Sequence, residues 1–343
     1  MGLLRRTALM FAAGAAAAAV VRGRRPPVLY DLRGRTVLVT GGSRGLGLVL
    51  ARGLVREGAR VAICGRDVET LERARVELER LGGEVLAVPC DVTAPAQVDD
   101  LVRIVHDWFG PLDVIVNNAG TIAVGAERAT TIEDYEEALR INFWGAVHVI
   151  RAALPDLRRR PGSRIVNITS IGGLVAVPHL LPYTASKFAL VGYSRGLRAE
   201  LAADGVVVTT VCPGLMRTGS PPNAYFKGRP RAEYAWFSVG DSLPGLTVSA
   251  ETACARILDA CRLGRAEVAF PFWVRLAAAG QAVAPELTAL ALTTMHRLLP
   301  AYHGAPTHER LRGWDAQSMV SPSWLTTLGD RATLRNNQTA ATR

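Results

Sequence analysis

Short, continuously apolar runs alternate with longer amphipathic stretches between about residue 33 and residue 270. The apolar runs are rich in β-branched residues, which is typical of strands, and the amphipathic stretches have helical spacing. We predict strands at residues 36–41, 60–65, 84–90, 113–120, 164–170 and 206–214. Strands that alternate with helices predict an α/β fold with a doubly wound parallel sheet. Their continuous apolar character fits a sheet that helices cover on both faces.

The chain divides into four predicted parts. Residues 1–30 form an apolar amino-terminal segment, and residues 31–270 form a single α/β domain. Residues 271–300 form an apolar helical extension, compatible with a packed helix pair, a cover over a substrate cleft, a membrane-surface element or a dimer interface. Residues 301–343 are polar, and we expect loose structure there.

The uncharged segment TALMFAAGAAAAAVV at residues 7–21 lies between two groups of arginines. As a helix it would rise about 22 Å, less than the ~30 Å hydrocarbon core of a bilayer. It is compatible with an uncleaved membrane anchor, with a cleaved secretory or twin-arginine signal, or with an Ala-rich helix that packs on the domain. Basic residues are more numerous on its carboxyl side, which would leave the main domain in the cytoplasm or on the cytoplasmic face of a membrane.

The net charge is +10, but seven arginines lie in the first 35 residues, so the basicity is partly local. The chain shows no basic stripe interleaved with aromatics and no helix-turn-helix or zinc pattern, and we therefore expect no nucleic-acid partner. The five cysteines have no CxxC spacing, and the six histidines have no paired-ligand spacing. These patterns predict reduced, buried thiols and no metal site.

The first predicted strand runs directly into a glycine-rich turn, TGGSRGLG, which a helical pattern follows. This order is the nucleotide-binding unit of a Rossmann-type domain, in which the turn and the helix amino terminus hold a pyrophosphate. The candidate cofactor-binding residues in the turn are Gly41, Ser43, Gly45, Leu46 and Gly47.

The second predicted strand ends in Gly65-Arg66-Asp67, near the position where NAD enzymes place an acid against the ribose. Arg66, together with Arg44 of the glycine turn, can bind a 2′-phosphate by charge-assisted hydrogen bonds. Asp67 can reach the ribose or cap the next helix, and we expect capping. The pattern favours NADP(H) over NAD(H).

Two further strands end in polar residues, and ligands of open α/β sheets bind at the carboxyl ends of strands. Asp91 and Val92 are candidates to contact the adenine. Asn118, Ala119 and Gly120 are candidates to line the ribose or to hold neighbouring strands together.

The motif YTASK places Tyr183 and Lys187 four residues apart, on one face of a predicted helix. A nearby ammonium stabilises a phenolate and lowers its pKa toward the working range of an acid–base catalyst. Ser170 ends a predicted strand, where its hydroxyl can bond a substrate carbonyl. Asn142 is a polar residue within an otherwise apolar helix.

With TGGSRGLG, NNAG, INFWG, ITS, YTASK and PGLMRT in this order, the chain resembles the short-chain dehydrogenase/reductase family over about residues 33–270. Its GxxxGxG spacing resembles that of the simple single-domain oxidoreductases of the family. The resemblance implies hydride transfer between NADP(H) and an external carbonyl or alcohol. A preference for NADP(H) would favour ketone reduction.

The resemblance also implies roles for individual residues. Tyr183 would be the general acid or base, and Lys187 would lower its pKa and hold the nicotinamide ribose. Ser170 would orient and polarise the carbonyl. Asn142 would position a water that links Lys187 to bulk solvent.

Three residues of PGLMRT, namely Pro213, Gly214 and Thr218, would contact the nicotinamide by the same resemblance. The family expectation is a homodimer or homotetramer. The apolar segments at both ends depart from the compact pattern and resemble membrane-associated members that act on lipophilic substrates.

Residues 219–246 follow this motif and are predicted to form a mobile flap over an apolar substrate. Its aromatic residues are Tyr225, Phe226, Tyr234, Trp236 and Phe237. The same pocket would be lined by Leu174, Val175, Val177 and His179. A sterol, a retinoid, a long-chain acyl group and a polyketide all fit this description.

An alternative function is a catalytically idle protein on the same fold, either a cofactor sensor or a membrane-tethered scaffold. Such a protein does not need Ser170, Tyr183 and Lys187, and all three are present. The sequence therefore favours the enzyme.

Overall fold

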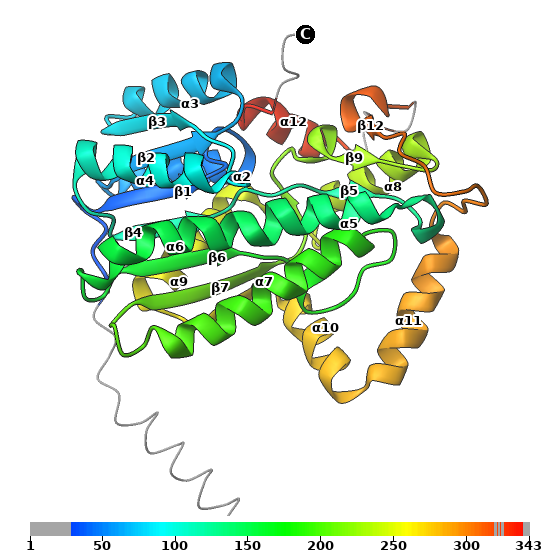
Figure 1. Ribbon diagram of the computed structural model, residues 1–343. Coiled ribbons are helices and arrows are strands. Elements are labelled where there is room, and N and C mark those ends of the chain that lie inside the picture. The colour runs from blue at the N-terminus through cyan, green and yellow to red at the C-terminus, as the bar shows by residue number, and fades with distance from the viewer. Residues whose placement is uncertain (1–28, 319–320, 322, 324–325, 339–343) are drawn as a thin grey trace, which may run out of the picture.

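The computed structural model describes residues 29–318, 321, 323 and 326–338 (Figure 1). The predicted apolar segment at residues 7–21 lies outside the described residues. Within them, no helix combines the length and apolar character needed to cross a membrane.

A seven-stranded parallel sheet forms the centre of the molecule, in the order β11-β7-β6-β4-β1-β2-β3. Its strands are β1 (Thr36–Thr40), β2 (Arg60–Gly65), β3 (Val85–Pro89), β4 (Val114–Asn117), β6 (Arg164–Ile168), β7 (Val207–Pro213) and β11 (Glu267–Phe270). The doubly wound α/β fold is confirmed. The prediction missed β11, because its four residues, EVAF, have only a short apolar run.

Helices cover both faces of this sheet (Figure 1). One face carries α2 (Gly45–Arg56), α3 (Val68–Arg80) and α9 (Ala250–Leu263); the other carries α4 (Pro95–Phe109), α6 (Gly145–Arg158) and α7 (Leu181–Glu200). Successive side chains of a strand point to opposite faces. Val37 and Val39 accordingly pack with α2, whereas Leu38 packs in the core beneath α4 and α6. Burial on both sides explains why these strands are apolar throughout.

Shorter elements build the carboxyl-end side of the sheet. They are β5 (Ala123–Val124), η1 (Glu127–Ala129), α5 (Ile132–Leu139), η2 (Arg140–Trp144), η3 (Ile171–Gly173), β8 (Met216–Arg217), η4 (Pro221–Asn223), β9 (Tyr225–Phe226), α8 (Pro230–Ser242) and β10 (Val248–Ser249). Strands β12 (Leu311–Arg312), β9 and β5 form a small second sheet. A two-stranded sheet pairs β10 with β8.

The apolar extension forms a pair of helices, α10 (Phe272–Val283) and α11 (Pro285–Leu298), which project from the body of the molecule (Figure 1). Much of its apolar surface is exposed, including Leu276, Val283 and Leu298.

In place of the loose structure expected after residue 300, the described residues there form β12, η5 (Gly313–Asp315) and α12 (Thr327–Arg335). Figure 1 shows α12 between α3 and α8. We call residues 327–338, that is α12 and the three residues after it, the C-terminal segment.

The predicted mobile flap is largely a packed structure. Phe226 and Tyr234 are fully buried and meet edge to face in a small apolar core. Because their rings pack against each other, these two aromatics are not available to line a substrate pocket.

Candidate functional site

A cavity of about 610 Å³ opens at the carboxyl ends of the strands. Its centre lies where β1 adjoins β4, the point at which the strand order reverses. Ligands of open α/β sheets bind at such a switch point. Most of the predicted cofactor-binding residues line it: Gly41, Ser43, Arg44, Gly45, Leu46, Arg66, Asp91, Val92, Asn118, Ala119, Gly120, Tyr183, Lys187 and Thr218.

The glycine turn has the shape that a pyrophosphate needs. Gly41 and Gly45 have positive φ angles of 62° and 56°, which favour glycine. A side chain at Gly47 would place its Cβ 2.1 Å from the Gly41 carbonyl oxygen, so Gly47 lies beneath the turn and packs it closely. Helix α2 begins here with no side-chain cap and no acidic residue in its first turn. Its amino terminus can therefore receive an anionic group.

Asn118 holds the turn in place. Its Nδ2 donates to the carbonyl oxygens of Thr40 and Gly41, each at 3.1 Å, and its main-chain N donates to Thr40 Oγ1 at 3.0 Å. The main-chain N of Ala119 donates to the same hydroxyl at 3.1 Å. Of the two predicted roles of Asn118, these contacts match the one that links neighbouring strands.

Three arginines line one end of the cavity: Arg44, Arg66 and Arg312. Burial, and then the charges of Arg312 and Arg66, lower the pKa of the Arg44 guanidinium. Asp67 caps α3, as expected: its side chain accepts a hydrogen bond from the main-chain N of Thr70 at 2.7 Å. That bond holds the pKa of the Asp67 carboxyl below its usual value.

Asp91 and Val92 follow β3, the strand next to β2, and both line the cavity. The Asp91 carboxylate accepts from the main-chain N of Thr93 at 2.9 Å, which shapes the turn. The Val92 side chain is buried, and a Cβ at Gly145 would come within 2.7 Å of its Cγ2. Helix α6 thus closely approaches the part of the cavity wall that Val92 forms.

Helix α7 carries the candidate catalytic pair. The Lys187 Nζ lies 5.6 Å from the centroid of the Tyr183 ring and donates to the Ile168 carbonyl at 3.0 Å. Ser170 follows β6, and its Oγ accepts from the main-chain N of Gly172 at 3.0 Å. A Cβ at Gly172 would lie 3.3 Å from Tyr183 Cε1 and 3.5 Å from Ser170 Oγ, so both side chains border the same small space.

Burial dominates the protonation of this pair. It raises the pKa of Tyr183, and a hydrogen bond with Ser170 opposes the rise. It lowers the pKa of Lys187 to about 8. Lowering of the Tyr183 pKa by Lys187 stays a prediction, because the direction seen here is determined by burial of the phenol. At neutral pH both groups carry their protons.

Asn142 lies in η2, a short π-helical turn between α5 and α6. Its Oδ1 accepts from the main-chain N of Thr121 at 2.8 Å, and its Nδ2 donates to the Thr121 carbonyl and to Ser186 Oγ. A Cβ at Gly120 would lie 3.0 Å from Asn142 Oδ1 and 3.7 Å from Lys187 Nζ. The absent side chain of Gly120 therefore leaves room between Asn142 and Lys187.

Several predicted site residues lie away from the cavity wall. Ser170 and Asn142 do not line the cavity, although their chain neighbours Thr169 and Ile141 do, and Pro213 and Gly214 do not line it either. A Cβ at Gly214 would meet the Trp273 ring at 2.8 Å. His179 is buried, where its Nδ1 lies 2.8 Å from Glu233 Oε1. It packs inside the small aromatic core region and does not line the cavity.

Sequence reasoning missed lining residues that come from distant parts of the chain. They are Thr70, Met216, Asn223, Arg312 and Gln338, with apolar Ile122, Ile141 and Ile168 near the catalytic pair. Ile141, Ile168 and Met216 lie within the motifs INFWG, ITS and PGLMRT, where they were not singled out, whereas the other five lie in no motif. For Arg312 and Gln338 the sequence offered no signal beyond a polar composition after residue 300, which predicted loose structure.

The described residues hold no group of three or more His, Cys, Asp or Glu placed to bind a metal ion. The five cysteines are buried and unpaired with one another by disulfides.

The family model for short chain dehydrogenases matches residues 35–224. A putative ketoacyl reductase from Streptomyces coelicolor is 40% identical over 183 residues, which span 53% of this chain and 70% of that protein. A D-beta-hydroxybutyrate dehydrogenase from Rhizobium meliloti is 34% identical over 186 residues, which span 54% of this chain and 72% of that protein.

Among solved structures, the chain is similar to an NADPH-bound short chain oxidoreductase from Pseudomonas aeruginosa with an atypical catalytic center. The TM-score is 0.62 at 30% identity, and the match covers 70% of this chain and 97% of that one. The C-terminal segment lies beyond the residues that the family model matches.

Proposed function

The chain belongs to the short-chain dehydrogenase family, and we propose that it interconverts a ketone and an alcohol on a lipophilic small molecule with NADP(H) as cofactor. The observation that carries the proposal is the meeting of Tyr183, Ser170 and Lys187 at one end of a cavity whose other end is a glycine turn. A cofactor held at the turn would extend to the catalytic pair.

The residues of the glycine turn fit such a cofactor. The α2 amino terminus, which no side chain caps, would bind its pyrophosphate, and Gly41 and Gly45 would let it approach the main chain. When bound, the cofactor supplies or accepts a hydride at the substrate carbon.

Tyr183 provides the proton. Its raised pKa keeps the hydroxyl protonated at neutral pH, so it can donate to a substrate carbonyl oxygen during reduction. Ser170 would hold the same oxygen, and the Lys187 ammonium would stabilise the resulting phenolate. Asn142 borders the space beside Lys187, where a water could return a proton to the pair. In the oxidative direction the proton moves the other way.

The three arginines support a preference for NADP(H). Arg66 and Arg312 are exposed at the cavity, and Asp67, the carboxylate that follows Arg66 in the chain, is engaged as a helix cap. A 2′-phosphate would neutralise part of this cluster, whereas an unphosphorylated ribose would leave the mutual repulsion in place.

Apolar lining near Tyr183 supports a lipophilic substrate. Ile122, Ile141 and Ile168 face the cavity there. Two relatives are a ketoacyl reductase and a hydroxybutyrate dehydrogenase, which fits an oxygen function on an acyl chain. We further propose a homodimer or homotetramer in the cytoplasm or at the cytoplasmic face of a membrane, reached through the amino-terminal segment.

The test combines binding with turnover. NADPH and NADH are titrated by calorimetry into the wild type, Arg66→Ala and Arg312→Ala, and a panel of ketones is assayed with the wild type and Tyr183→Phe. We expect the arginine variants to lose about tenfold in NADPH affinity with little change for NADH. We expect Tyr183→Phe to lose about 10²- to 10⁴-fold in turnover with cofactor binding retained.

Equal affinity of the wild type for both cofactors would overturn the NADP(H) preference. Tight cofactor binding without turnover of any ketone or alcohol would favour the sensor or scaffold alternative. Arg128→Ala is a suitable control for the arginine variants, because Arg128 does not line the cavity.

A further inference from the structure

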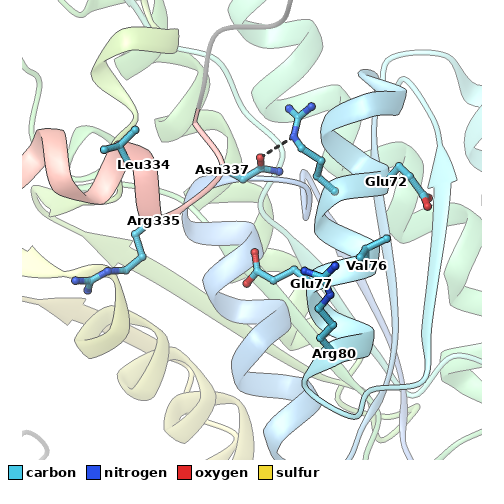
Figure 2. Close-up of a pocket in the computed structure, with 8 residues that line it drawn as sticks. Glu72, Val76, Glu77, Arg80, Leu334, Arg335 and Asn337 are labelled. Carbon is cyan, nitrogen blue, oxygen red and sulfur yellow. Dashed lines mark hydrogen bonds between the residues drawn. The ribbon is translucent and has the colours of Figure 1, made fainter.

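The C-terminal segment is bound to the glycine turn itself. The main-chain N of Gly45 donates to the Asn336 carbonyl at 2.9 Å. Asn337 Nδ2 donates to the carbonyl oxygens of Ser43 at 2.9 Å and Thr70 at 3.0 Å. Arg73 of α3 donates to Asn337 Oδ1 at 3.2 Å, the dashed bond in Figure 2. The segment is thus a fixed part of the cavity wall.

Further bonds tie the segment to both sides of the cavity. Asn336 is 1% exposed; its Oδ1 accepts from Arg52 of α2 at 3.0 Å, and its Nδ2 donates to the Thr218 carbonyl at 3.3 Å. At Gly219, with φ of 78°, a Cβ would come within 2.4 Å of Thr333 Cα. The segment therefore joins the glycine turn to the chain that follows β7.

One amide of this segment faces the cavity, and its orientation is determined by its neighbours. Arg44 can only donate, and its Nη1 bonds Asn223 Oδ1 at 2.9 Å. Asn223 must then present its Nδ2 to Gln338, whose Oε1 accepts at 2.7 Å. The Nε2 of Gln338 is consequently the end that points at the glycine turn, and a Cβ at Gly45 would lie only 2.6 Å from it.

This Nε2 lacks a partner. Gln338 is 4% exposed, and among the described residues its Nε2 has no hydrogen-bond acceptor. Gln338 lines the cavity, so this amide donor is available to a group in the cavity that accepts a hydrogen bond. The amino terminus of α2 lies beside it. No side chain caps this terminus, although its first main-chain N, that of Gly45, donates to Asn336, and the helix dipole there favours an anion.

We propose that Gln338 is a cofactor-binding residue, which donates from Nε2 to the pyrophosphate of the dinucleotide held on the glycine turn, and that the C-terminal segment slows release of that cofactor. The inference rests on the proposed function, because it takes the ligand of the turn to be a dinucleotide. The segment closes the cavity over the turn and leaves the catalytic end to Tyr183 and Lys187.

The test uses the full chain and measures NADPH affinity by calorimetry and NADPH release by stopped-flow fluorescence. Gln338→Glu keeps the acceptor for Asn223 and the size of the side chain but replaces the donor with a negative charge. We expect this variant to bind NADPH about tenfold or more weakly and to release it faster. Gln338→Ala, which removes the donor without adding charge, should show a smaller change in the same direction. Gln281→Glu makes the same substitution on α10, away from the cavity, and should behave as the wild type.

A second ligand separates a pyrophosphate contact from a structural role. Adenosine 2′-phosphate has no pyrophosphate, so its affinity should be the same in the wild type and in Gln338→Ala. An equal loss for NADPH and for adenosine 2′-phosphate would overturn the proposal, because it would mean that the variant disturbs the whole cavity. Unchanged NADPH binding in both Gln338 variants would also overturn it. Tighter binding in both would overturn it too, because it would mean that the segment obstructs the cofactor site.

The wild type separates this inference from the proposed function. A wild type that binds neither NADPH nor NADH would overturn the proposed function and the inference with it. A wild type that binds NADPH and turns over a ketone, beside a Gln338→Glu variant with wild-type affinity and release rate, would overturn the inference alone.

Discussion

The two ends of the cavity are built in different ways. At the catalytic end, one helix supplies Tyr183 and Lys187, and apolar burial determines their protonation. At the glycine-turn end, a polar segment closes the wall, and Asn337 reaches a carbonyl 294 residues away in sequence. The protonation states at the catalytic end depend on excluding water. The closed wall at the glycine-turn end depends on hydrogen bonds between side-chain donors and main-chain acceptors. Variants of the two ends should therefore fail differently: one in turnover, the other in retention of the cofactor.

We expect Ser170→Ala to show the largest difference between an effect on turnover and an effect on cofactor binding. Loss of this hydroxyl would remove the donor proposed for the substrate oxygen and one hydrogen bond to Tyr183. Turnover should fall about 10²- to 10³-fold, as for other donors to a developing oxyanion, while NADPH affinity stays unchanged. Steady-state kinetics and calorimetry on the same preparation measure both.

A matched control is Ser194→Ala on α7, the helix that carries Tyr183. Ser194 is buried and bonded to Asn167 and Thr210, so its loss should cost stability and leave turnover intact. If Ser170→Ala weakened NADPH binding as strongly as it slowed turnover, the proposed division between the two ends would be wrong.

The next effect concerns the charge buried at the catalytic end. Lys187 is 4% exposed, and its pKa falls from 10.5 to about 8 in the folded chain. Between those pH values the unfolded chain binds the extra proton, so this group makes the free energy of unfolding rise with pH. The penalty of the buried ammonium is fully present below about pH 8 and is gone above about pH 10.5.

The measurement compares the wild type with Lys187→Met by urea unfolding from pH 7.5 to 10.5. The difference in unfolding free energy should shift by about 3 kcal/mol in favour of the wild type as the pH rises. Parallel curves for the two proteins would show that the ammonium is hydrated in the folded state.

The smallest of these effects is expected from Asn337→Gly. Glycine keeps the positive φ of 54° but removes the side chain that bonds Ser43, Thr70 and Arg73. Each lost bond contributes about 1 kcal/mol to holding the segment. Trypsin should therefore cut after Arg335 about tenfold faster, while turnover at saturating cofactor stays the same. Leu334→Ala, at an exposed residue of the same helix, serves as the control (Figure 2). Equal protection of both variants would show that the side-chain bonds of Asn337 do not hold the segment.

The sequence predicted the catalytic end more fully than the other. Tyr183 and Lys187 are one helical turn apart, so local spacing is enough to bring them together. The glycine turn and the capping role of Asp67 are equally local, and the six predicted strands are found in the sheet. Contacts within a few residues leave a pattern that can be read directly.

The rest of the site depends on tertiary contacts that leave no such pattern. Arg312 and Gln338 reach the cavity only because the small sheet and α12 pack beside it. Hydropathy does not predict burial in the carboxyl-terminal part of the chain. Apolar Val283 and Leu298 are 84% and 83% exposed, whereas polar Asn336 is 1% exposed. Asn336 can be buried because its side chain is hydrogen-bonded, and these hydrogen bonds cannot be predicted from composition.

The long separation between the C-terminal segment and the glycine turn also affects the order of events during synthesis. At about 5–20 residues per second, the ribosome adds Asn337 about 15–60 s after Ser43. The sheet from β1 to β7 can form during that interval, but the wall beside Gly45 cannot. A nascent chain therefore passes through a stage with a folded but open nucleotide site, and the cofactor can enter before the segment that retains it has been made.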